Sequence, residues 1–130
     1  ALRNIDRNID DARMRAIAST GGIIGIDIHA GHIGPPRGAD AHLDDVVAHI
    51  EHAVQVAGIT HVSIGSDLDG AIVQPKDADG AATWPLLARK LAAKGWKADD
   101  ISALFHDNAM RVLSIPLSRG CGSDRQTPKN

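Results

Sequence analysis

Side chains that could do chemistry follow two short apolar runs in this sequence. His29 and His32 come after the run at residues 23–28, and Asp67 comes after the run at residues 61–65. Nearly continuous apolar runs of this length are typical of buried parallel strands. In parallel α/β folds the working residues lie at the C-terminal ends of the strands. The two strand ends are therefore where we look for function.

Asp67 is the sharpest candidate for catalysis. It ends a predicted buried strand, where a carboxylate has no structural reason to face the core. The alternative is that Asp67 or Asp69 caps a turn with Gly70, since Asp-Gly sequences are common in turns. Both interpretations of Asp67 remain open from the local sequence, whereas Asp69 is assigned to the turn.

The histidines give only weak metal-binding signals. His29 and His32 could bind a metal near a strand end, but a separation of three in an irregular loop is little evidence. His49 and His52 stand at i and i+3 and share one helix face, without a third ligand in view. We interpret that pair as helix-surface histidines beside an apolar stripe, and we assign no metal ligand in this chain.

Two further side chains, those of Arg7 and Cys121, could take part in chemistry. Arg7 precedes the first predicted helix and could reach a site on the loop side of the strands. Cys121 is the only cysteine, which excludes an internal disulfide. It has no base nearby, so a catalytic thiol is not expected there.

The elements that must position these residues follow from hydrophobic periodicity. It predicts strands at 23–28 and 61–65, loops at 29–41 and 67–82, and helices at 8–19, 42–57, 84–94 and 98–113. Strands that alternate with helices predict an α/β fold with a parallel sheet and right-handed crossovers. Two strands cannot close a sheet and leave apolar edges, so we expect further strands to belong beside them.

The C-terminal part of the sequence changes character. We expect the last helix to bury its apolar side chains, namely Ile101, Leu104, Phe105, Met110, Val112 and Leu113. From Ser114 the chain is rich in Gly, Pro, Ser and charged residues, which predicts a poorly ordered tail.

Composition excludes several function classes. The 130 residues are enough for one domain with a real core, and the net charge of −2 gives no strong attraction for nucleic acid or an anionic membrane. No apolar run is long enough to span a bilayer. The sequence opens at Ala1 without a starting Met or a signal-peptide pattern, so we expect a piece of a longer protein.

Several stretches together resemble the C-terminal third of the membrane (renal) dipeptidase family, zinc metallopeptidases of the amidohydrolase superfamily. They are residues 7–11 continuing into 15–18, then 21–26, 61–70 and 108–113. The helix that contains His49 and His52 also resembles the family helix that precedes the Ser-Asp-Phe-Asp-Gly motif. No single motif is decisive, but their order and spacing are specific.

This resemblance implies a (β/α)8 TIM barrel. Such a barrel needs about 250 residues, so this chain would supply the last two strands and the final helices. Residues 1–113 would then be the C-terminal part of the barrel, and residues 114–130 a loose tail. The remainder of the barrel would be the partner of this chain, and a homodimer of the complete enzyme stays open.

The resemblance also implies an activity. Members hydrolyse dipeptides, some with a D-residue in second position, using two zinc ions. Their ligands are a His-x-Asp pair, a bridging Glu and two later histidines, which all lie upstream of the matched region. None of these ligands can be carried over to this sequence. A bacterial cytoplasm or periplasm is the expected compartment.

Residue roles follow by position. Arg7 matches the arginine that grips the substrate's terminal carboxylate, for which a guanidinium fork is well suited. Asp67 matches the strand-8 carboxylate, which accepts a proton from the metal-bridging water and passes it to the leaving amine. His29 and His32 stand in the loop after strand 7, where we interpret them as lining of the substrate pocket.

Competing interpretations remain. The first is a metallodipeptidase of which this chain is one part, inactive when isolated. The second is a catalytically inactive barrel segment with a structural or interaction role, because no metal ligands are found. The third is a small α/β binding domain that shares only two βα units. A His-x-Asp strand upstream would support the first, and its absence the second.

Overall fold

The computed structural model describes residues 2–35 and 40–119, with only the backbone described for 115–119. In this part of the chain, strands β1 (Ile24–Asp27) and β2 (Val62–Ser66) form one parallel sheet. Ile24 pairs with Val62, and an irregularity after Ile26 pairs Asp27 with Ser66. The predicted α/β fold with two parallel strands is thus confirmed.

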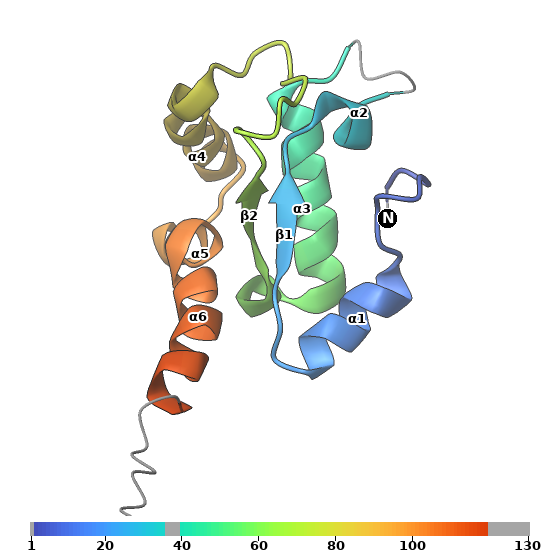
Figure 1. The fold of residues 1–130 in the computed structure, drawn as a ribbon. Helices are drawn as coiled ribbons and strands as arrows, with labels where there is room; N and C mark the ends of the chain where they lie inside the picture. The colour runs from blue at the N-terminus through green and yellow to red at the C-terminus, as the bar shows by residue number, and fades with distance from the viewer. Residues whose placement is uncertain (1, 36–39, 120–130) are drawn as a thin grey trace, which may run out of the picture.

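One face of the sheet is covered by α3 (Leu43–Ala57), and no described helix covers the other face (Figure 1). The helix follows β1 and returns the chain to the start of β2, as predicted from its apolar stripe. Its buried side chains form the core with the strands; they are Leu43, Val46, Val47, Ile50 and Ala53. The opposite face of the sheet exposes Gly25 and Gly65.

The first helix, α1 (Asp11–Ser19), packs beside α3 on the β1 side of the sheet (Figure 1). It begins three residues later than predicted because Asp10 is its N-cap. The Asp10 carboxylate accepts a hydrogen bond from the Arg13 backbone N–H at 2.8 Å. Gly21 follows the helix with φ 78°, a conformation that favours glycine.

The predicted loop at 29–41 contains a helical turn, α2 (Ala30–Ile33), so this part of the prediction was wrong. His29 caps the turn, since its Nδ1 accepts a hydrogen bond from the Gly31 N–H at 2.8 Å. The glycines and prolines of this segment hid the turn from a propensity argument. Two short 3-10 turns, η1 (Ile59–His61) and η2 (Gly80–Ala82), complete the connections.

The C-terminal helices lie on the β2 side of the sheet (Figure 1). They are α4 (Thr83–Ala93), α5 (Ala98–Ser102), the π-helical turn η3 (Ala103–Asp107) and α6 (Asn108–Arg119). The last helical stretch therefore runs past residue 113 into the segment predicted as a tail. Residues 120–130, including Cys121, lie outside the described residues.

The burial predicted for the last helix is only partly correct. Leu104 is fully buried, but Met110 is 49% exposed and Leu113 is 62% exposed. The turn η3 closes i→i+5 rather than i→i+4 hydrogen bonds, so it rotates the face of the helix that follows. After Asp107, the apolar stripe expected for a regular α-helix therefore no longer coincides with the buried face of the helix.

Helix α6 is tied to the starting ends of both strands. Asn108, only 4% exposed, donates a hydrogen bond to the carbonyl of Val62 at 2.8 Å. Arg111 donates to the carbonyls of Gly21 and Thr60, each at 2.8 Å. These contacts explain structurally the Asn108–Arg111 spacing that contributed to the family resemblance.

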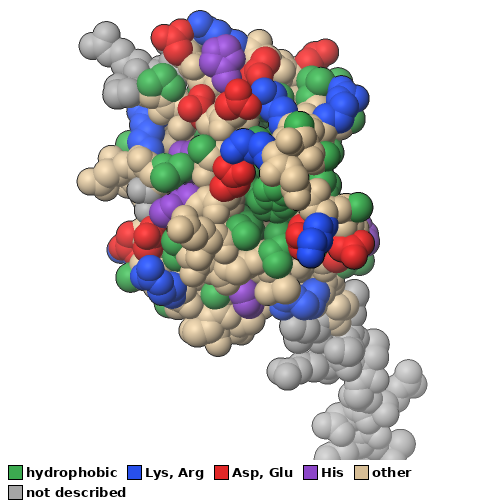
Figure 2. All heavy atoms as spheres, turned by 180° about the vertical axis from the view of Figure 1, so that it is seen from behind, with side chains coloured by type: hydrophobic (Ala, Val, Ile, Leu, Met, Phe, Trp, Pro, Cys, Tyr) green, Lys and Arg blue, Asp and Glu red, His purple; other side chains and the backbone are tan. Residues whose placement is uncertain are grey.

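The surface has mixed charge. On the face seen in Figure 2, acidic and basic side chains are interspersed, with hydrophobic side chains between them. None of the helices within residues 2–35 and 40–119 has the length and apolar character needed to cross a bilayer.

Candidate active site at the strand ends

Asp67 follows β2 directly and has a left-handed backbone. Its φ is 61° and that of Ser66 is 32°, values that are uncommon for residues other than glycine. The Asp67 carbonyl accepts a hydrogen bond from the Gly70 N–H at 3.0 Å. A side chain at Gly70 would collide with the Asp67 carboxylate, with Cβ only 2.4 Å from Oδ1. Asp67 therefore does form a turn, as the alternative interpretation predicted.

The turn does not occupy the Asp67 carboxylate with another side chain. The residue is exposed, and within the described part of the chain no hydrogen bond or ion pair engages its carboxylate oxygens. The strand before it is buried only at Val62 and Ser63, so the expectation of a strand end within the core was wrong. An accessible carboxylate on a constrained backbone is suited to contact a ligand.

The two strands approach each other closely on the uncovered face. A Cβ built on Gly65 would lie 3.1 Å from the carbonyl carbon of Gly25 and 3.2 Å from its Cα. Since these neighbours are backbone atoms, they cannot move aside as a flexible side chain would. Gly25 and Gly65 therefore allow the two strands to lie close together just before their C-terminal ends.

At the end of β1, Asp27 organises the turn α2. One of its carboxylate oxygens accepts from the His29 backbone N–H at 3.0 Å, and the other lies 2.8 Å from His32 Nδ1. The His29 and His32 rings stack with centroids 4.4 Å apart. Asp27 was assigned no role of its own from the sequence, because it stands near the end of an apolar run.

His29, predicted to line the substrate pocket, has a structural contact of its own. Its Nδ1 accepts from Gly31, so a neutral ring carries its proton on Nε2. That nitrogen is left as a donor on a half-buried side chain. His29 is not among the residues that line the cavity beside β1.

Arg7 lies in the N-terminal arm (residues 2–10) and borders a cavity of about 290 Å³ at the unpaired edge of β1. Asn8, Asp27 and apolar side chains from α1 and β1 line the same cavity. Arg7 is exposed, and among the described residues no carboxylate forms an ion pair with it. Its guanidinium is therefore available to an anionic ligand.

The helix α3 histidines contact other elements rather than lying free on its surface. His52 Nε2 lies 2.8 Å from Asp11 Oδ1 and so joins α3 to α1. His49 lines the cavity beside β1, where burial lowers its pKa against the opposing effect of a hydrogen bond with Ile33. We predicted helix-surface histidines beside the apolar stripe, and in the structure both are half-buried, with α1 packed against α3.

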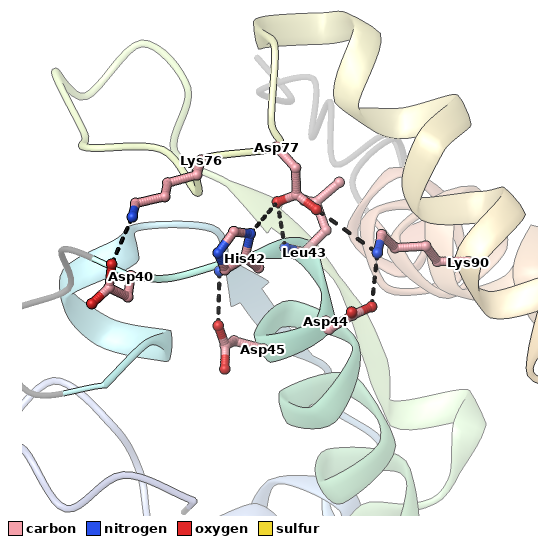
Figure 3. A network of polar contacts seen from close by, with 8 residues as sticks. All are labelled: Asp40, His42, Leu43, Asp44, Asp45, Lys76, Asp77 and Lys90. Carbon is pink, nitrogen blue, oxygen red and sulfur yellow. Dashed lines mark hydrogen bonds and ion pairs between the residues drawn. The ribbon is translucent and has the colours of Figure 1, made fainter.

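The loop after β2 is fastened to the start of α3 (Figure 3). Asp77 accepts a hydrogen bond from the Leu43 N–H at 2.8 Å and thereby caps that helix. Lys76 reaches Asp40 at 2.6 Å. Lys90 lies 2.8 Å from Asp44, and this hydrogen bond lowers the pKa of the Asp44 carboxyl. The loop that begins at Asp67 is thus held beside the loop that follows β1.

The described residues do not by themselves fit a metal centre. Within residues 2–35 and 40–119, no group of three His, Cys, Asp or Glu side chains is arranged to hold an ion. Asp27, His29 and His32 are neighbours at the end of β1, and their hydrogen bonds join them to one another and to the backbone. What the described residues offer chemically is a free carboxylate at the end of β2, an imidazole donor at the end of β1 and a free guanidinium beside the unpaired edge of β1.

Comparisons with known proteins agree on one family. The sequence pattern of the membrane dipeptidase family (Peptidase family M19) matches residues 1–117. An uncharacterized Klebsiella pneumoniae protein encoded 5′ of pqqA is 33% identical over 109 residues, covering 82% of this chain and 40% of that protein. The chain spans less than half the length of the curated relatives named among its matches.

Solved structures of metallopeptidases are also similar to this chain. The dipeptidase AC, a metallopeptidase of family M19, superposes with a TM-score of 0.76 at 26% identity, covering 83% of this chain and 32% of its own. A Rhodobacter sphaeroides metallopeptidase, bound to a phosphinate mimic of the dipeptide L-Ala-D-Ala, gives 0.74 at 27% identity, covering 83% and 31%. The chain therefore belongs to the membrane dipeptidase family of metallopeptidases.

Proposed function

We propose that this chain supplies strands 7 and 8 of a (β/α)8 barrel, with β1 and β2 in those places. The two strands are parallel, one face is covered by α3, and the other is uncovered, as barrel strands require. The matched structures are about three times longer than the aligned part, which leaves room for the other strands. In this assignment residues 1–113 belong to the barrel, and α6 continues from there to Arg119.

The complete barrel is proposed to hydrolyse dipeptides with two zinc ions. Because the described residues lack a metal-binding group, the zinc ligands would come from outside this chain. The observation that carries the proposal is the free Asp67 carboxylate at the end of β2, on the same sheet edge as the site formed after β1.

Each proposed role uses a polar side-chain group that forms no hydrogen bond or ion pair within the described part of the chain. Arg7 would bind the C-terminal carboxylate of the dipeptide through paired N–H···O bonds. Asp67 would take a proton from the attacking water as its oxygen bonds to the carbonyl carbon, and deliver that proton to the departing amine nitrogen. The His29 Nε2 donor would contact the bound substrate from the β1 side.

A catalytically inactive structural segment is the second candidate function. It is favoured by the lack of a metal-binding group among the described side chains. In that case, Arg7 and Asp67 would have no effect on turnover in any assembly.

The test compares zinc-loaded complete protein with this chain alone, using L-Ala-D-Ala as substrate. We expect hydrolysis by the complete protein and none by the isolated chain. Arg7→Ala should raise KM roughly 100-fold, the loss expected for a charged bidentate contact. Arg15→Ala, which removes an exposed arginine from α1, is the matched control. A complete protein that binds zinc but hydrolyses no dipeptide would contradict the proposal.

A further inference from the structure

The N-terminal arm that carries Arg7 is docked on the turn α2. The Asn8 side-chain amide donates to the His32 carbonyl at 2.9 Å and to the Arg3 carbonyl at 3.1 Å. The Arg3 guanidinium donates to the Gly31 carbonyl. Figure 1 shows the arm on the same side of β1 as α2, away from β2. The residue next to Arg7 is thus bound to a turn more than twenty positions along the chain.

Asp27 holds the turn α2 in place. Its carboxylate bonds both to the start of the turn, at the His29 N–H, and to the His32 ring. The His32 and Asp27 side chains are only 17% and 29% exposed, so water competes weakly for this pair. Asp27 is also the register partner of Ser66, the residue before Asp67.

A continuous set of contacts therefore runs from the Asp67 end of β2 to the arm that carries Arg7. We infer that Asn8 is a positioning residue. Together with the Asp27–His32 pair, it fixes Arg7 in the position needed to bind the substrate carboxylate. This inference rests on the proposed function.

The experiment uses the complete zinc-loaded enzyme and two substrates, L-Ala-D-Ala and its C-terminal amide, which lacks the carboxylate that Arg7 would bind. Asn8→Ala should raise KM for the dipeptide about tenfold, as loss of one well-formed hydrogen bond allows, with little change in kcat. The amide substrate should show a much smaller change. Asn4→Ala, at an exposed asparagine of the same arm, is the control.

A double-mutant cycle separates positioning from general destabilisation. If Asn8 acts through Arg7, Asn8→Ala should cost nothing further in an Arg7→Ala background. Equal losses for the dipeptide and its amide, or additive losses in the double variant, would overturn the inference while leaving dipeptide hydrolysis intact. A wild-type enzyme without dipeptidase activity would overturn the proposed function, and this inference with it.

Discussion

Replacing Asn108 by Ala should destabilise the chain strongly, because one buried amide satisfies two carbonyls. The Asn108 Nδ2 atom lies 2.7 Å from the Ile59 carbonyl oxygen and 2.8 Å from that of Val62. The Val62 contact is buried, so leaving its acceptor unpaired should cost about 1–3 kcal/mol. The Ile59 contact is partly buried and should add about 0.5–1.5 kcal/mol. We therefore expect a loss of about 2–4 kcal/mol.

Urea unfolding followed by far-UV circular dichroism measures this loss. With a slope of about 2 kcal/mol per molar, in the middle of the range typical of small proteins, the midpoint should fall by roughly 1–2 M. Met110→Ala on the same helix is the control, since it trims a side chain that is 49% exposed and should stay within about 0.5 kcal/mol. Equal unfolding free energies for the two variants would refute the assigned role of Asn108.

Two other predictions concern the cavity and the strand contact. Burial lowers the His49 pKa below 6.5, so the unfolded chain takes up the proton first as the pH falls. The free energy of unfolding should therefore decrease as the pH falls below about 6.5. His49→Gln should reduce this pH dependence in urea titrations, and an unchanged dependence would contradict the prediction. Gly65→Ala should destabilise by about 1–3 kcal/mol because its Cβ would press on the Gly25 backbone, and a fully stable variant would show that the strands can separate at no cost.

The regular elements were predictable because their patterns are local. The apolar stripe of α3 and the short apolar runs of β1 and β2 indicated parallel strands joined by a helix. The phase of α6 was not predictable, since a π-helical turn leaves no clear mark in the pattern of apolar residues. Met110 and Leu113 were therefore predicted to be buried, whereas both side chains are exposed.

The site was only partly accessible to sequence reasoning. Asp67 was singled out by its place at a strand end and Arg7 by its place before the first helix. Their roles came from the family resemblance and stay predictions. Asp27 was given no role because it stands in an apolar run, although an Asp whose carboxylate can bond the backbone two residues on is a known turn former. Asn8 could not be found, because its contact with the His32 carbonyl depends on how the arm folds back.

Turnover by an Asp67→Asn variant of the complete enzyme is the most direct test of the account. The substitution keeps the shape of the side chain and removes the proton acceptor. With zinc content measured on the same samples, we predict that kcat falls about 10²–10⁴-fold while the metal stays bound. Near-normal kcat with bound zinc would contradict the role proposed for Asp67, and with it the active site placed at the end of β2.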